Sequence, residues 1–177
     1  MGKNYGHLYY KAENGPGTQI WKPSSQVQLG ESEGVLYACY PYPKYANGNI
    51  RDIYIEANSN SQDDFMYAGP YSGLNVENKH VDITLKHALA AIKLTTRRGS
   101  YEGPGAIRSI GLGGYCGGYN GNFDVIQGKF TKVNTGGIIY PTTSFNLSDG
   151  PNEQYIMLIP TGEPGDLMIR MTIDEVY

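Results

Sequence analysis

Apolar and polar residues alternate along this chain in many short runs, which is the pattern of half-buried β-strands. The run Val81–Leu94, VDITLKHALAAIKL, also changes its pattern. Its apolar residues occupy odd positions up to Leu85 and even positions from Ala88 onward, with Leu89 interrupting the alternation. The Ala-rich half would also suit two turns of helix, but the β-branched residues on either side favour a strand. A strand whose core-facing side changes by one residue needs a bulge, a bend or a crossing between two sheets.

Other short strands are predicted between clusters of Gly, Pro, Asn and Ser, and no helix of ordinary length is predicted. They are His7–Tyr10, Gln19–Lys22, Gln26–Leu29, Gly34–Tyr40, Arg51–Glu56, Phe65–Ala68, Ile107–Leu112, Ile138–Tyr140 and Ser144–Leu147, together with a strand pair or bulged strand over Asp124–Val133. Tyr155–Ile159 and Leu167–Ile173 are predicted to form a closing hairpin. Apolar residues on both faces of VLYACYPY, before Pro41, predict a central strand that is covered on both sides.

Composition narrows the class of protein. A chain of 177 residues is long enough for one domain with a sizeable core, and a second full domain is not expected within it. A net charge of −3 excludes the basic surface that nucleic acid requires. The 24 Gly, 10 Pro and 16 Tyr residues are typical of an all-β surface protein with many turns. No segment is long and apolar enough to be a transmembrane helix, and the start MGKNYGHLYY lacks the apolar region of a signal peptide.

Residues that could carry chemistry are few. None of the three histidines lies at metal-ligand spacing from another His or a Cys, and His87 is interpreted as a packed or capped residue at the edge of the core. Cys39 and Cys116 could pair, but two separate thiols are the simpler interpretation. Asp63 and Asp64 are adjacent, and neighbouring residues of a strand point apart, so shared acid–base catalysis is not expected. No catalytic, metal or cofactor site is predicted, and the chain is not expected to be an enzyme.

The glycine-rich segment Gly111–Gly121, GLGGYCGGYNG, lacks the ending of a phosphate-binding loop and is interpreted as a flexible loop between two strands. Its Tyr115 and Tyr119 could present their rings to a sugar or a protein partner. The alternative is that these tyrosines only cover strand edges. Both interpretations stay open at this point.

Four segments, in this order, resemble the fimbrillin family, the FimA-like and Mfa-like pilins and surface proteins of Gram-negative anaerobes. They are Trp21 followed by Leu29, then VLYACYPY, SQDDFMYA at Ser61–Ala68, and VDITLKHALAAIKL. The resemblance covers roughly Asn4 to Leu94, and the rest of the chain is similar only in its β character. The signature residues, to which the resemblance gives a structural role, are Trp21, Tyr37, Tyr40, Pro41, Tyr42, Asp64, Met66, His87 and Ala88.

The resemblance implies a transthyretin-like or immunoglobulin-like β-sandwich of roughly seven or more strands with little helix. It also implies export as an outer-membrane lipoprotein and assembly with other pilin subunits by donor-strand exchange. Residues 1–177 would then be a single sandwich domain, or the N-terminal domain of a longer two-domain protein. Two family features are missing from the sequence, a lipidated N-terminal Cys and an Arg before Arg51 at which an Arg-specific protease could cut.

The sequence therefore favours a non-enzymatic structural or adhesive subunit of a fimbria on the cell surface. The alternative is a carbohydrate-binding surface module in which Trp21 and the Tyr-rich loops stack on glycans of a host or of other bacteria. The first hypothesis predicts an open apolar groove beside an edge strand, or a terminal segment that docks poorly. A sandwich that lacks one strand can receive an extended segment of another subunit.

Overall fold

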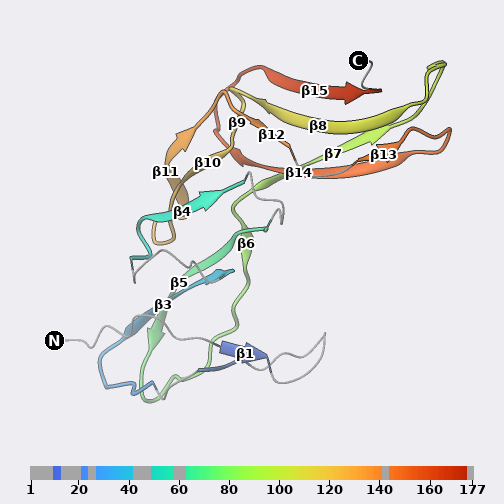
Figure 1. The fold of residues 1–177 in the computed structure, drawn as a ribbon. Coiled ribbons are helices and arrows are strands. Elements are labelled where there is room, and N and C mark those ends of the chain that lie inside the picture. The colour runs from blue at the N-terminus through green and yellow to red at the C-terminus, as the bar shows by residue number, and fades with distance from the viewer. Residues whose placement is uncertain are drawn as a thin grey trace. The chain divides into compact units, whose positions relative to one another are not determined.

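The structure is a computed structural model that describes residues 10–12, 21–23, 27–41, 49–57, 63–140 and 144–174. These residues form fifteen strands and no helix, so the all-β fold class is confirmed. The strands are drawn as arrows in Figure 1. The chain divides into two compact units. The first comprises Met1–Tyr37 and Gly69–Ile83, and the second comprises Ala38–Ala68 and Thr84–Tyr177.

Two small sheets contain the N-terminal strands. β1 (Tyr10–Ala12) pairs with β2 (Trp21–Pro23), and a second sheet has the order β3-β5-β6, with β3 at Gly34–Tyr40, β5 at Met66–Leu74 and β6 at Lys86–His87. The predicted strand over residues 26–29 is not formed by the described residues 27–29. Tyr42 and residues 7–9 of the first predicted strand lie outside the described residues.

β3 is an edge strand of its three-stranded sheet in the described part of the chain, so the prediction of a central strand covered on both sides is wrong. Val35 and Tyr40 are more than half exposed. An edge strand can carry apolar residues on both faces when its aromatic side chains are amphipathic, because tyrosine tolerates partial exposure. The apolar pattern alone therefore did not distinguish a central strand from an edge strand.

The change of pattern in Val81–Leu94 marks a crossing between two sheets, which confirms one of the predicted alternatives. β6 pairs with β5, where His87 lies opposite Met66, and after a bend at residues 88–89 β7 (Ala90–Thr96) pairs with β14. Residues 81–85, which alternate like a strand, are not in one. Alternation of apolar and polar residues is therefore not sufficient to form a strand, because a ladder also needs a neighbouring strand in register.

The second unit contains a sheet built around β8 (Ala106–Gly114). β15 (Leu167–Ile173) pairs with one side of β8 along its length, and β12 (Ile138–Ile139) and β13 (Phe145–Asn146) also pair with β8, near its two ends. The register of β8 against β15 shifts near Arg108. This irregularity moves the core-facing positions of β8 from odd to even residue numbers.

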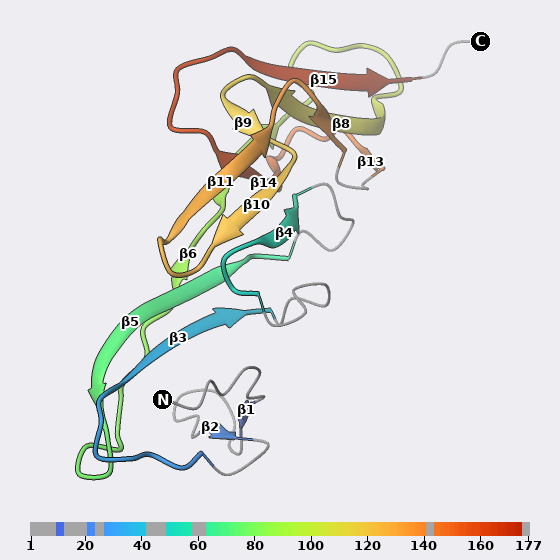
Figure 2. The ribbon, with the colours of Figure 1, turned by 90° about the vertical axis from the view of Figure 1, so that its left-hand side faces the viewer.

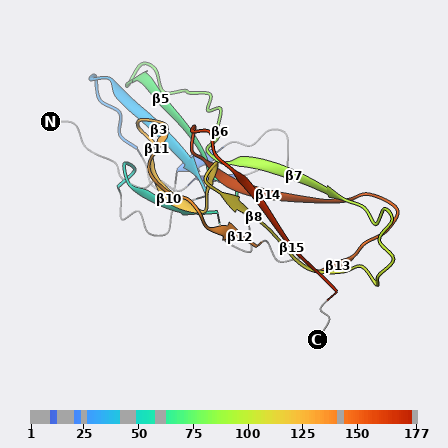
Figure 3. The ribbon, with the colours of Figure 1, turned by 90° about the horizontal axis from the view of Figure 1, so that it is seen from above.

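A facing sheet has the order β7-β14-β9, with β14 at Asn152–Pro160 and β9 at Gly117–Gly118. Because β14 pairs with β7 while β15 pairs with β8, the prediction that the last two strands form a hairpin is wrong. β14 and β15 diverge from the end at which the chain connects them (Figure 3), and the connection leads from one sheet to the other. A hairpin and a connection between layers have similar turn-rich sequences, so composition did not separate them.

These two sheets are the layers of a β-sandwich, and the apolar core lies between them (Figure 1). Both layers contribute side chains that are almost fully buried. They are Ile107, Ile110 and Leu112 of β8 and Ile156, Leu158 and Ile159 of β14. In β7, the apolar residues Ile92 and Leu94 lie on one face, as their even-numbered positions predicted.

A third sheet, β11-β10-β4, completes the second unit (Figure 2). β4 (Ile53–Glu56) alternates buried and exposed residues as predicted, and β10 (Asn120–Asp124) forms the predicted strand pair with β11 (Lys129–Asn134). Asp124 shapes the turn between them, because its carboxylate accepts hydrogen bonds from the backbone N–H groups of Ile126 and Gln127 at 2.8 and 3.0 Å.

The glycine-rich segment is mostly strand, which corrects its interpretation as a flexible loop. β8 extends to Gly114, and β9 and β10 follow within the same segment. Glycine is needed here for close approach, since a methyl group at Gly113 would overlap the carbonyl oxygen of Gly137. The absence of side chains, which suggested flexibility in the sequence, instead allows backbones to pack tightly.

Candidate functional site: an uncovered strand edge

β15 is an edge strand, because β8 is the one strand with which it pairs in the described residues (Figure 1). Its other edge carries backbone N–H and C=O groups without a ladder partner there. Such an edge is a template on which a further strand can form.

The side of β15 that faces the core is also uncovered. Leu167, Ile169 and Met171 lie opposite Gly114, Leu112 and Ile110 of β8 in the antiparallel register, and residues directly opposite each other lie on the same side of a sheet. Leu112 and Ile110 are buried, whereas Leu167, Ile169 and Met171 are 46, 52 and 38 % exposed. We call these three residues the open row. The core of the sandwich is thus closed beneath β8 and open beneath β15.

The opposite side of β15 faces away from the core. Met168 is 53 % exposed on this side, and Arg170 is exposed beside it. The strand therefore has an apolar row toward the core and a mixed row toward the outside. This arrangement suits one more strand that lies beside β15 and places its own apolar residues over the open row.

The far end of β15 is fastened by polar contacts. The carboxylate of Asp174, which follows the strand, accepts hydrogen bonds from the Tyr101 hydroxyl at 2.7 Å and from the backbone N–H groups of Gly105 and Ala106 at 2.8 and 2.6 Å. Desolvation works to raise the pKa of Asp174. The hydrogen bonds from Tyr101, Gly105 and Ala106, with the positive charge of Arg108, outweigh it and lower the pKa below its ordinary value.

The signature residues of two separate segments meet in the structure. The His87 ring nitrogen Nδ1 lies 2.5 Å from a carboxylate oxygen of Asp64, and the backbone N–H of Ala88 donates to the carbonyl of Phe65 at 2.8 Å. Together with the pairing of Met66 and His87, these contacts join β5 to β6 where the chain crosses between sheets. His87 is exposed rather than packed, so its contact with Asp64 is at the surface.

Two of the other signature residues, Tyr37 and Tyr40, lie in β3. Tyr37 packs closely against Gly69, Tyr40 is exposed, and Pro41 follows the strand. Trp21 is in β2 with its side chain outside the described atoms. The structural role that the sequence assigned to these residues stays a prediction.

The two tyrosines proposed as ligand contacts differ in their surroundings. The Tyr115 ring is 68 % exposed. Tyr119 is half-buried and packs over Gly137, where a methyl group would meet its ring. Contact with a glycan or a partner stays a prediction for both, and Tyr115 alone offers a free ring.

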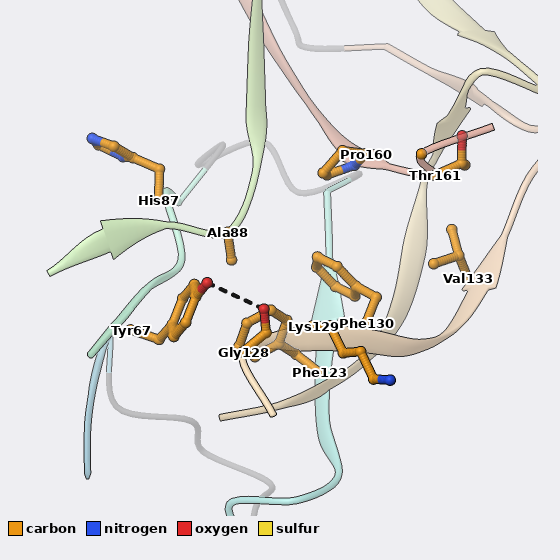
Figure 4. Close-up of a pocket in the computed structure, with 11 residues that line it drawn as sticks. Tyr67, His87, Ala88, Phe123, Gly128, Lys129, Phe130, Val133, Pro160 and Thr161 are labelled. Carbon is orange, nitrogen blue, oxygen red and sulfur yellow. Dashed lines mark hydrogen bonds between the residues drawn. The ribbon is translucent and has the colours of Figure 1, made fainter. Parts of the chain in front are cut away.

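A pocket of about 410 Å³ lies beside the aromatic residues of the third sheet (Figure 4). Its walls include Tyr67, Phe130 and Pro160, and Tyr67 donates a hydrogen bond to the carbonyl of Gly128 at 3.1 Å. Figure 4 shows the His87 ring and the Lys129 amino group directed away from its centre. These two side chains therefore do not direct a charged or titratable group into the pocket.

The described residues contain no group of three or more His, Cys, Asp or Glu side chains that could hold a metal ion. Cys39 and Cys116 are not bonded to each other, and burial raises the pKa of the Cys39 thiol to about 11. No helix in the described ranges is long and apolar enough to span a membrane.

Sequence reasoning missed the open row and Asp174. The signal for the open row was the pattern of LMIRMTI, which we assigned to a closing hairpin with Tyr155–Ile159. Asp174 gave no signal, because its three hydrogen-bond donors lie about 70 residues earlier in the chain.

Comparison with known proteins places these features in a family. No curated protein matches the chain. Among solved structures, the chain is similar to the crystal structure of "a putative cell adhesion protein" from Bacteroides uniformis, with 16 % sequence identity and a TM-score of 0.58. The match covers 90 % of this chain and 60 % of that one, and it shows a shared fold. The family model described as fimbrillin-like matches residues 2–177. The resemblance noted in the sequence is thus confirmed, and the chain belongs to the fimbrillin-like family.

Proposed function

We propose that this chain is a non-enzymatic structural or adhesive subunit of a fimbria, and that it joins other subunits by receiving an extended segment along β15. Family membership supports a fimbrial or adhesion subunit at the cell surface. The observation that carries the proposal is the open row beside a free strand edge. An exposed apolar row beside an edge strand is the kind of surface on which an extended segment of another subunit could bind.

The energetics of the edge favour an incoming strand. Each residue of the open row exposes about half of its side chain, and covering this much apolar surface stabilises a complex by on the order of 1 kcal/mol per residue. Backbone hydrogen bonds along the free edge of β15 would align the incoming strand. The expected partner is an extended segment with apolar residues at alternate positions.

Several finer features belong to the same proposal. A lipid anchor, an outer-membrane location and donor-strand exchange with other pilins follow from the family resemblance. We also infer that residues 1–177 are one domain of a longer two-domain subunit, and the 60 % share of the similar structure supports this. Binding of surface glycans or proteins by the assembled subunit is part of the adhesive role.

Self-association of the chain tests the proposal. Sedimentation velocity of the concentrated protein should show oligomers, and Ile169→Lys should abolish them, because the new charge points toward the apolar side that a partner strand must cover. Met168→Lys is the matched control. It introduces the same charge at a residue of similar exposure on the opposite side of the same strand, and it should leave the oligomers in place.

Two results would overturn the proposal. One is a chain that stays monomeric at every concentration. The other is an equal loss of oligomers in both variants, which would mean that the added charge acts without regard to the open row. Circular dichroism of each variant establishes that the fold is retained.

A further inference from the structure

The C-terminal end of β15 makes polar contacts in addition to its ladder with β8. Its core-facing residues are half exposed, and among described residues β15 is paired on one edge only. At the C-terminal end of the strand, the Ser109 hydroxyl donates a hydrogen bond to the Thr172 hydroxyl at 3.2 Å, and Asp174 accepts three hydrogen bonds just beyond the strand. An edge strand with few buried contacts frays readily, so hydrogen bonds at its end have a large effect on how often the strand opens.

The backbone at Asp174 is part of this fastening. Its φ of 42° is positive, and Asp174 is the sole non-glycine residue of the described chain with a positive φ. Its N–H donates to the carbonyl of Ala106 at 2.9 Å. An unfavourable backbone conformation persists where the surroundings hold it, and here the carboxylate and the N–H both bind the first residues of β8.

The loop that supplies these donors is itself held in place. The Arg98 guanidinium donates to the carbonyl of Pro104 at 3.0 Å and to that of Leu147 at 3.3 Å. The carbonyl of Arg98 accepts from the N–H of Tyr101 at 3.1 Å. These contacts hold the three donors in position for the carboxylate, and the Arg98 guanidinium contributes by binding backbone carbonyls.

We infer that Asp174 is a carboxylate lock, closed by Tyr101, Gly105 and Ala106, that fixes the end of β15 on β8 and so keeps the free edge of β15 in register for a partner strand. The inference rests on the proposed function for the role of that edge. The lock itself is a property of the single chain and can be tested without a partner. In it, Asp174 is a positioning residue and does not contact the partner.

The lock depends on the charge of the carboxylate. The positive charge of Arg98 acts on Tyr101. The groups that act on the Asp174 carboxylate are the Tyr101 hydroxyl, the backbone N–H groups of Gly105 and Ala106, and the positive charge of Arg108. All of them favour the ionised form. Because the folded-state pKa lies below the unfolded one, the lock is fully closed above about pH 4 and opens as the pH falls through the folded-state pKa.

Hydrogen–deuterium exchange measured by mass spectrometry at pH 7 tests the lock. Asp174→Asn should speed exchange of the amides of residues 167–173 by about tenfold or more. The substitution removes the negative charge that strengthens these hydrogen bonds, and it replaces one acceptor oxygen with an NH₂ group that faces other donors. Peptides of β14 and β10 should exchange as before. Tyr101→Phe, which removes one of the three bonds, should have a smaller effect confined to the same residues.

The matched control is Asp166→Asn, which removes an exposed carboxylate just before the other end of β15 and should leave exchange unchanged. Unchanged exchange of β15 in Asp174→Asn would overturn the lock, and so would faster exchange spread over the whole chain. Sedimentation then separates the two proposals. If Asp174→Asn loosens β15 while Ile169→Lys fails to reduce oligomers, the lock stands and the docking role of the edge is wrong.

Discussion

Phe123 shows at the level of single residues how the second unit is held together. Its ring is almost fully buried and contacts three other aromatic rings, with centroid distances of 5.5 Å to Phe65, 4.8 Å to Tyr67 and 4.9 Å to Phe130. Edge-on and tilted arrangements of this kind are the favourable ones for aromatic pairs. The ring thus joins β5, β10 and β11 through a single side chain.

Replacing Phe123 by Ala should therefore destabilise the protein by about 3–5 kcal/mol, because the substitution removes buried apolar surface and leaves a cavity among three rings. The measurement is the urea midpoint followed by circular dichroism. Tyr115→Ala serves as the control, since that ring is exposed, and its midpoint should stay within about 0.5 kcal/mol of the parent. A loss of similar size in both variants would contradict this account of Phe123.

At the level of elements, the sequence predicted strands more reliably than their neighbours. The alternation of Ile53 and Ile55 with polar residues predicted β4, because a strand with one buried face has an apolar residue at every second position. The slip before Ala88 predicted the crossing between β6 and β7 for the same reason. Pairing is a different matter. The local sequence of Leu167–Ile173 does not indicate that this strand pairs with β8. It also does not indicate that the core-facing side is left uncovered by the described strands.

The glycines of β8 show the same limit. From the sequence GLGG alone, glycines suggest a flexible backbone. In the structure, the lack of a side chain at these glycines makes room for the backbone of the neighbouring segment. Only the identity of the neighbour distinguishes the two, and that neighbour comes from the distant residues 136–138. For the candidate site, the sequence hypothesis called for an edge strand beside apolar surface, and no local pattern indicated which strand that would be.

Gly113→Ala tests the close approach of β8 and β12. The added methyl group would overlap the Gly137 carbonyl, so β12 must move away and give up its pairing with β8. Overpacking of this kind costs about 1–3 kcal/mol, which a urea titration measures directly. Gly30→Ala is the control, because a methyl group there has no atom within 4 Å. Equal midpoints for the parent and Gly113→Ala would show that the segments are not tightly packed.

At the level of the whole molecule, the sandwich of the second unit is narrow. Over most of their length, and counting the described strands, one layer consists of β8 and β15 and the other of β7 and β14. Layers of two strands bury little apolar surface by themselves. Under the proposed function, a partner strand beside β15 would complete this layer and bury the open row.

Thermal stability should therefore depend on protein concentration. If a segment of one chain binds the edge of another, a tenfold rise in concentration stabilises the bound state by up to about 1.4 kcal/mol and raises the unfolding midpoint by roughly 2–5 °C for a chain of this size. Ile169→Lys, which blocks the edge, should unfold at a midpoint that is independent of concentration, whereas Met168→Lys should follow the parent. Differential scanning calorimetry at three concentrations decides the matter. A parent midpoint that does not change with concentration would mean that the open row is stable without a partner, and the assembly role of β15 would then be wrong.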